Sequence, residues 1–197
     1  MTEIAPNPAR AKASRPAPLD AQAWIAAALL ALGQSGIEAV RVEPLAKALK
    51  VTKGSFYWHF KDRAALIDAM LDEWAQGRIA AIRSQTADAD PSAALRRLAD
   101  LYTGRTNARG LAIELAIRTL ARSGKAAAAA VARVDRERLA HVAALFAGLG
   151  WPDNEARARA ILFYGFLFGQ SLLDRQTARA DDNLRAVEAV LAGPPLG

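Results

Sequence analysis

The chain has 197 residues, a formal net charge of +6 and no cysteine. The absence of cysteine excludes disulfides, thiolate metal ligands and a cysteine nucleophile. Hydrophobic residues make up 52% of the chain, enough for a buried core, and no stretch alternates apolar and polar residues as a half-buried strand would. We therefore expect an all-α protein of about nine helices.

The first 18 residues contain several prolines and an acidic residue but no apolar core. We expect them to form a disordered arm rather than a secretory signal or a transit peptide. The longest apolar run, from 160 to 173, is interrupted by Gln170 and Ser171 and is shorter than the ~20 residues that span a bilayer. It predicts a buried helix, and we expect a cytoplasmic protein with no membrane partner.

Two helices are expected directly after the arm. Asp20 has the chemistry of an N-cap for the first helix, which should end at Gly33 or Gly36. The second should be short, over about 42–49, and it tolerates Pro44 because the first turn of a helix does not need that N–H group.

A tight turn over 50–52 should follow, with Thr52 capping a third helix over 53–59. Phe56 and Phe60 should face the core. Asp62 is then expected to cap a long fourth helix that ends near Gln85, because its apolar residues keep helical spacing.

Further helices are predicted at 91–102, 110–122, 125–149, 153–173 and 181–191. We predict four parts in the chain: the arm over 1–18, a helix-turn-helix domain over 19–63, a connecting helix over 64–85, and a ligand-binding and dimerisation domain over 86–197.

Positive charge is concentrated near the predicted turn. Between Arg41 and Arg63 there are six basic residues against two acidic ones, which is the pattern expected where a protein neutralises phosphates. Two short helices joined by a tight turn can place the second helix in a DNA major groove. The small Gly54 and Ser55 would let the backbone approach a duplex. The side chains able to reach phosphates or base edges are those of Lys53, Tyr57, Trp58 and His59.

Some of these aromatic residues allow a second interpretation. Tyr57 and His59 could pack in the core, and Trp58 could cover a neighbouring surface instead of entering a groove. The sequence favours exposure of Tyr57 and His59, because Phe56 and Phe60 already supply an apolar face.

The stretch VEPLAKALKVTKGSFYWHFKDRAALIDAML resembles the TetR family of bacterial regulators. The resemblance covers residues 20–75 and is strongest over 53–61, where a small residue, aromatic residues, His59, Phe60 and Lys61 follow in the family's order. It implies that Tyr57, His59 and Lys61 contact backbone phosphates and that Thr52, Lys53 and Ser55 line the groove.

Two positions depart from the family pattern. Arg41 stands where the family usually has a hydroxyl residue that grips a phosphate, so its contact is expected to differ in detail. Lys50 stands where glycine is common in the turn. A lysine there must adopt a left-handed conformation at some energetic cost, unless the turn has another shape.

In the helix predicted at 153–173, Gly165 and Gly169 lie on one face. They could permit close packing inside one subunit or form a dimer interface together with Leu172. In the family that the chain resembles, the last two long helices build a four-helix dimer interface, which favours the second interpretation. A dimer also suits two recognition helices that enter successive major grooves.

The resemblance also implies a mostly apolar pocket for a small-molecule effector of unknown identity. Glu114 and Arg118 are four residues apart and could instead pair on the helix surface, and His141 could be purely structural. The candidate pocket residues are Tyr102, Glu114, Arg118, His141, Tyr164 and Gln170.

We predict a transcriptional regulator that binds a palindromic double-stranded DNA operator as a homodimer, a repressor released by its effector. It needs no metal and no cofactor. The alternatives are an activator or a ligand-independent helix-turn-helix regulator and, much less favoured, an all-α enzyme with Glu114, His141 or Asp174 as acid or base. Two histidines and no carboxylate cluster argue against that enzyme.

Overall fold

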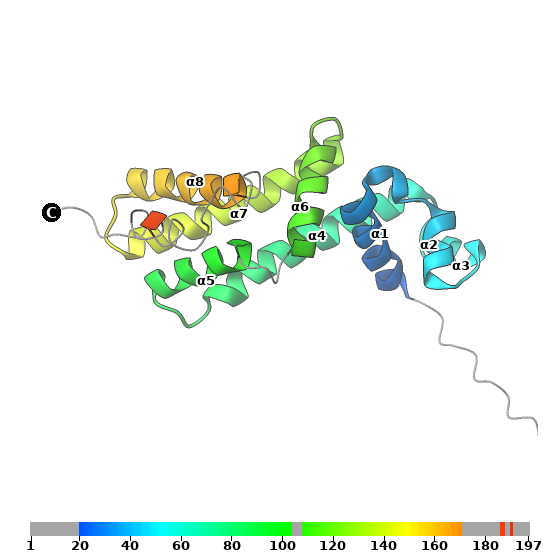
Figure 1. Ribbon diagram of the computed structural model, residues 1–197, viewed down its shortest axis with the longest axis horizontal. Coiled ribbons are helices and arrows are strands. Elements are labelled where there is room, and N and C mark those ends of the chain that lie inside the picture. Colours follow the sequence, from blue (N-terminus) through cyan, green and yellow to red (C-terminus); the bar gives the residue numbers. More distant parts are fainter. Residues whose placement is uncertain (1–19, 104–107, 171–185, 188–189, 191–197) are drawn as a thin grey trace, which may run out of the picture.

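The computed structural model describes residues 20–103, 108–170, 186–187 and 190. Within these ranges the chain forms α-helices and one short 3₁₀ helix and no strand, which confirms the all-α prediction. Figure 1 shows an elongated molecule with α1, α2 and α3 at one end and α5, α7 and α8 extending to the other. The elements are α1 (Ala21–Ser35), η1 (Ile37–Ala39), α2 (Val42–Leu49), α3 (Lys53–Tyr57), α4 (Arg63–Thr86), α5 (Pro91–Thr103), α6 (Ala108–Ala121), α7 (Lys125–Gly148) and α8 (Asp153–Gln170).

The first helices begin and end where local chemistry dictates. Asp20 Oδ1 accepts the N–H of Ala23 at 2.9 Å and so satisfies one of the N–H groups at the start of α1. Gly36 ends α1 with a φ of 76°, a conformation that suits glycine. Asp62 caps α4 in the same way as Asp20 caps α1, with 2.8 Å between its Oδ1 and the N–H of Ala65.

The structure corrects three details of the prediction. The third helix ends at Tyr57 and not at residue 59, because the N–H groups of His59 and Phe60 both turn back to the carbonyl oxygen of Phe56. Thr52 is the N-cap of α3, but its side chain makes no capping hydrogen bond. The sixth helix covers 108–121 in place of 110–122. The helix predicted at 181–191 lies largely outside the described residues.

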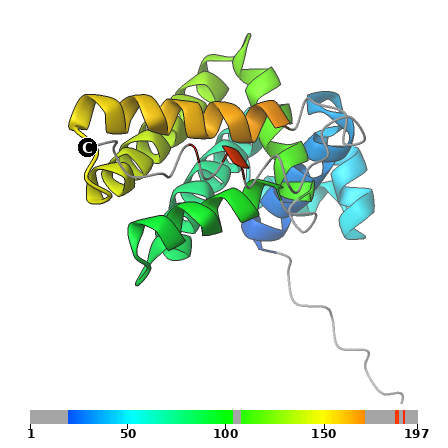
Figure 2. The same cartoon turned by 60° about the vertical axis from the view of Figure 1, so that its left-hand side comes forward.

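Two groups of buried apolar side chains hold the helices together. The first joins α1–α4 to α6 and α7, and its largest members are Trp24, Phe56, Leu66, Met70 and Trp74. The second joins α5, α7 and α8 around Phe146 and Phe163. Figure 2 shows the orange and yellow α8 lying along α7 on one side of the molecule.

Helix α6 packs directly on α1, and a glycine makes this close approach possible. A Cβ atom added at Gly33 would lie 2.8 Å from Cγ1 and 3.3 Å from the backbone nitrogen of Ile113. Any larger residue at position 33 would therefore push α6 away. The C-terminal helices are thus in van der Waals contact with the helix that supports α2 and α3.

Candidate nucleic-acid interface and buried charge cluster

A sharp turn positions α3 relative to α2. Lys50 has φ 57° and ψ 40°, the left-handed conformation expected from its place in the turn. The N–H group of Lys50 donates to the carbonyl oxygen of Lys47 at 3.2 Å, and the N–H group of Val51 donates to the carbonyl oxygen of Ala46 at 3.0 Å. A side chain in this conformation is strained by about 1–2 kcal/mol. The turn is held by backbone bonds that leave the side chains of Lys50 and Thr52 exposed.

Helix α3 has one buried face and one exposed face. Phe56 is fully buried, and its ring meets Trp24 edge to face with 5.3 Å between centroids. Phe60 is 8% exposed and packs against Phe56. On the other face, Tyr57 is 62% and Trp58 88% exposed. Because both phenylalanines anchor the segment, the aromatic residues between them point to solvent.

The remaining candidate contacts share this outward orientation. His59 is exposed, so the alternative in which Tyr57 and His59 pack in the core is wrong. Ser55 is half-buried at the edge of the face. The other exposed candidates, around the turn, in α3 and at the start of α4, are Arg41, Thr52, Lys53, Gly54 and Lys61.

The positive surface contains one short, exposed ion pair between its own residues. Lys53 Nζ lies 2.7 Å from Glu43 Oε1, with both side chains 60% exposed. The hydrogen bond from Lys53 is the main reason that the pKa of Glu43 is lowered below its ordinary value. Among the described residues, Arg41, Lys47 and Lys50 form no ion pair. Most of the positive charge on this face is therefore available to a partner.

Arg63 has a different role from its basic neighbours. Its guanidinium is half-buried and donates to the carbonyl oxygens of Val40 at 2.6 Å and Ile37 at 2.7 Å. These bonds tie the first turn of α4 to the segment that precedes α2. The charge pattern of the sequence groups Arg63 with the phosphate-neutralising residues, but its guanidinium donates to backbone carbonyl oxygens inside the protein. No local pattern around Arg63 signals this.

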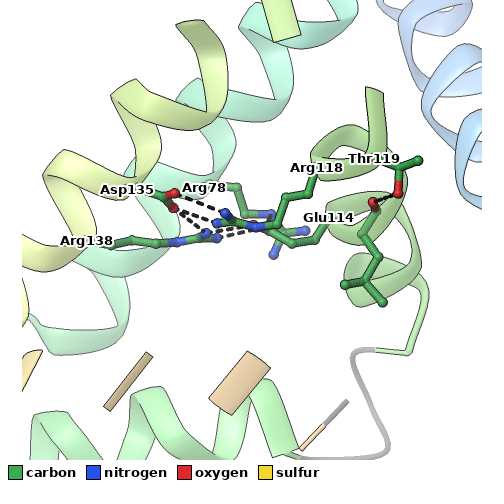
Figure 3. Close-up of polar contacts among 7 residues, drawn as sticks. Arg78, Glu114, Arg118, Thr119, Asp135 and Arg138 are labelled. Atoms are coloured by element: carbon green, nitrogen blue, oxygen red, sulfur yellow. Dashed lines mark hydrogen bonds and ion pairs between the residues drawn. The ribbon is translucent and has the colours of Figure 1, made fainter. Parts of the chain in front are cut away.

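A buried cluster of charges lies between α4, α6 and α7 (Figure 3). Glu114 and Arg138 are each only 1% exposed and form a two-bond pair, with nitrogen–oxygen distances of 2.8 and 2.9 Å. Arg118 donates from Nε to Glu114 at 2.9 Å and makes two bonds to Asp135, at 3.0 and 2.6 Å. The predicted pairing of Glu114 with Arg118 is confirmed, but it lies in the interior and not on a helix surface.

The electrostatics of this cluster keep Glu114 ionised. Burial by itself would raise the pKa of Glu114. The hydrogen bond from Arg138 and the charges of Arg138, Arg118 and Arg78 outweigh burial and lower that pKa below its ordinary value. No local pattern links Arg138 to Glu114, because the two residues are 24 positions apart on different helices.

The structure brings together only part of the predicted effector pocket. Tyr164 is 5% exposed, and the guanidinium carbon of Arg138 lies 5.8 Å from the centre of its ring. His141 Nε2 lies 2.7 Å from Oγ1 of Thr86. Glu114 and Arg118 thus pair in the cluster and Tyr164 lies beside Arg138, whereas the observed partner of His141 is Thr86. The side chains of Tyr102 and Gln170 lie outside the described residues.

The outer face of α8 is apolar and lacks a packing partner among the described residues. Ile161 is 60% and Leu162 59% exposed. Cβ atoms added at Gly165 and Gly169 would meet no atom within 4 Å. The two glycines therefore do not serve close packing against any described residue of the subunit. Leu172 lies outside the described residues. None of the helices in the described part of the chain is long and apolar enough to cross a membrane.

Together, α2, the turn and α3 define a helix-turn-helix protein. Residues 25–70 match the model of the family described as bacterial regulatory proteins, tetR family. Over 52 residues the chain is 40% identical to tetracycline repressor protein class G of Vibrio anguillarum. The match covers 26% of this chain and only 25% of that repressor. Residues 25–70 are therefore similar to the DNA-binding segment of TetR-family regulators.

Solved structures resemble the chain over nearly its whole length. A transcriptional regulator from Rhodococcus sp. Rha1 has a TM-score of 0.73 at 20% identity, over 89% of this chain and 95% of that one. A TetR family member from Streptomyces coelicolor A3 has a TM-score of 0.60 at 26% identity, over 86% and 96%. The fold is thus that of these solved transcriptional regulators.

Proposed function

We propose that this chain is a ligand-responsive transcriptional repressor that binds a palindromic double-stranded DNA operator as a homodimer. A small-molecule effector bound in the helical body would release it from the operator. The observation that carries this proposal is the division of α3 into a buried face at Phe56 and an exposed, partly basic face from Lys53 to His59.

The proposed DNA contacts divide into two groups. Arg41, Tyr57, His59 and Lys61 are assigned to backbone phosphates, which fix register and orientation but carry no sequence information. Thr52, Lys53, Gly54 and Ser55 lie at the start of α3 and Trp58 directly follows its end. All five are assigned to the groove. Lys53 would exchange its exposed ion pair with Glu43 for a contact with DNA, at little cost because such pairs contribute little.

Dimerisation is assigned to the outer face of α8. Its exposed Ile161 and Leu162 lie beside Gly165, where absent side chains allow a second helix to approach closely. Pairing of this face between two copies would set the distance between the two α3 helices. Half-sites on B-DNA lie about 34 Å apart, so that distance decides whether both helices can bind at once.

Helix α6 offers a route from the body to the DNA-binding end. Ile113 contacts α1 at Gly33, and the next residue, Glu114, is fixed in the buried charge cluster. A ligand that shifts α6 or α4 would therefore move the support of α3. Such a ligand releases DNA only if it binds better to the arrangement with the wrong half-site spacing.

The decisive experiment is selection of bound fragments from random double-stranded DNA, followed by a salt titration with the recovered site. We expect two inverted half-sites with centres about 10 base pairs apart, or a multiple of that spacing. Six to ten phosphate contacts would lower the affinity roughly a thousandfold or more between about 50 and 200 mM salt. Arg97→Ala, an exposed arginine on α5, is the control and should bind as the unaltered protein does.

Recovery of no sequence, or a flat response to salt, would contradict operator binding. Recovery of a single unpaired half-site would contradict the dimer. Expression of a reporter placed behind the recovered site distinguishes repression from activation, since loss of the regulator raises expression only in the first case.

A further inference from the structure

The buried cluster contains more positive than negative charge. Three guanidinium groups, those of Arg78 on α4, Arg118 on α6 and Arg138 on α7, face two carboxylates, those of Glu114 and Asp135. Arginine stays protonated in proteins, so this excess cannot be removed by loss of a proton. Within the described part of the chain, the cluster therefore has a surplus of one positive charge.

The surplus is located at Arg78. Arg138 and Arg118 each make two bonds to one carboxylate, and Arg118 makes a third to Glu114. Arg78, by contrast, has a single ion pair among the described residues, a long one of 3.9 Å from Nε to Glu114 Oε2, and no hydrogen bond. Its side chain is only 19% exposed. Its remaining donors have no hydrogen-bond partner among the described residues and still reach solvent, so an anion can bind them.

The cluster has a fully buried floor and a partly exposed rim. Glu114 and Arg138 form the floor, at 1% exposure each. Arg118 and Asp135 retain 27% and 36% exposure, and no nitrogen of Arg78 is among those sealed from solvent without a partner. An anion can therefore reach Arg78 without opening the Glu114–Arg138 pair.

Aromatic rings border the same cations. The guanidinium carbon of Arg118 lies 4.5 Å from the centre of the Phe168 ring, and that of Arg138 lies 5.6 Å from it. The rings of Tyr164 and Phe168 stack with 6.1 Å between centroids. Phe168 thus lies beside Arg118 and Arg138, the two guanidiniums that share Glu114 with Arg78.

We propose that Arg78 anchors the effector, and that the effector is a small organic monocarboxylate with an apolar or aromatic body. The regulatory role of this ligand as an effector rests on the proposed function, whereas its binding at Arg78 does not. A carboxylate matches the planar fork of a guanidinium in two parallel hydrogen bonds. One negative charge balances the single surplus charge, whereas a phosphate dianion would leave the cluster negative.

Binding of a carboxylate at Arg78 would also act on α4, the helix that carries this residue. A carboxylate at Arg78 replaces the long contact to Glu114 by short bonds, and α4 begins at the DNA-binding end with Arg63. An effector would therefore shift α4 relative to α6 and α7. The same shift would reach the support of α2 and α3 through the bonds of Arg63.

The test is calorimetric titration of the DNA-free full chain with benzoate, phenylacetate and 3-phenylpropionate, each beside its neutral amide, with phenyl phosphate as a dianion and benzylamine as a cation. We expect at least one acid to bind in a saturable way and its amide on the order of tenfold more weakly or worse, because the amide lacks the charge-assisted bonds. Phenyl phosphate should bind more weakly than the best acid and benzylamine should not bind.

Three variants distinguish a specific contact with Arg78 from a general effect of positive charge on acid binding. Arg78→Gln should lower the affinity for the best acid on the order of tenfold or more, and Arg78→Lys should restore part of it. Arg83→Gln removes an exposed arginine of the same helix and should leave the affinity unchanged. Circular dichroism confirms that each variant folds, and Arg78→Lys keeps the test valid should Arg78→Gln fail to fold.

No acid binding better than its amide would overturn the proposal, as would equal binding by Arg78→Gln or tighter binding of phenyl phosphate. Operator binding is measured separately, without acid. Failure of operator binding with intact acid binding would remove the repressor assignment and leave the carboxylate site. The opposite outcome would remove the carboxylate site alone.

Discussion

Cations occupy two contrasting places in this molecule. At the α2–α3 end they face solvent, and the aromatic Phe56 and Phe60 face inward. In the body the arrangement is reversed, and Arg138 lies in the interior on a buried carboxylate. Exposed cations attract a partner from a distance and are screened by salt. Buried cations hold helices in one arrangement, and removal of one member leaves the others unbalanced.

The largest difference should appear in stability. Glu114→Ala removes the carboxylate that faces three guanidiniums, and we expect it to lower the free energy of unfolding by about 3–5 kcal/mol, the usual cost of breaking a buried pair. Urea denaturation followed by circular dichroism measures this loss. Glu43→Ala removes an exposed partner and should leave the midpoint nearly unchanged. Equal losses in both variants would abolish the contrast between the two regions.

The second-largest effect concerns how the exposed lysines contribute to DNA binding. Lys61→Ala should weaken binding to every DNA sequence alike and lower the slope of log affinity against log salt by about one, because it removes one phosphate contact. Lys53→Ala should change sequence preference, by about 1–3 kcal/mol at the base pairs it contacts. Fluorescence anisotropy with the selected operator and with single-base variants separates the two. Identical profiles for both variants would refute the division into phosphate and groove contacts.

A smaller effect concerns the turn between these helices. Lys50→Gly relieves the left-handed strain of the lysine and should raise the free energy of unfolding by about 1 kcal/mol. The same change removes one positive charge from the DNA-facing surface. We therefore expect a more stable protein that binds its operator more weakly, measured by urea denaturation and anisotropy. A loss of stability would mean that Lys50 makes a compensating contact.

The smallest effect is a pH dependence in the body. Burial and the charge of Arg83 lower the pKa of His141 below its ordinary value of 6.5, although Glu137 opposes them. The unfolded chain then binds a proton that the folded chain does not, so stability falls as the pH drops below about 6.5. His141→Gln should flatten this dependence in denaturation curves between pH 7.5 and 5. If the pH dependence of stability were unchanged in His141→Gln, other titrating groups would be its cause.

Much of the α1–α4 region could be predicted because its signals are local. Asp20, Gly36 and Asp62 mark helix ends through bonds to residues three or four positions away, and the alternation of Phe56 and Phe60 with exposed residues defines the faces of α3. The buried cluster could not be predicted in this way. Its central pair joins residues 24 positions apart, and a Glu–Arg pair four apart is equally typical of an exposed helix face.

The two bonds of Arg63 bear on the reprogramming of operator specificity. They end on backbone carbonyl oxygens of Ile37 and Val40, which any amino acid at those positions provides. Exposed side chains before α2 can therefore be exchanged without loosening the attachment of α4, provided that Arg63 and the fully buried Val40 stay. A chimera that receives a new α2–α3 segment from a relative should retain Arg63, so that the grafted unit keeps the orientation that the body imposes on it.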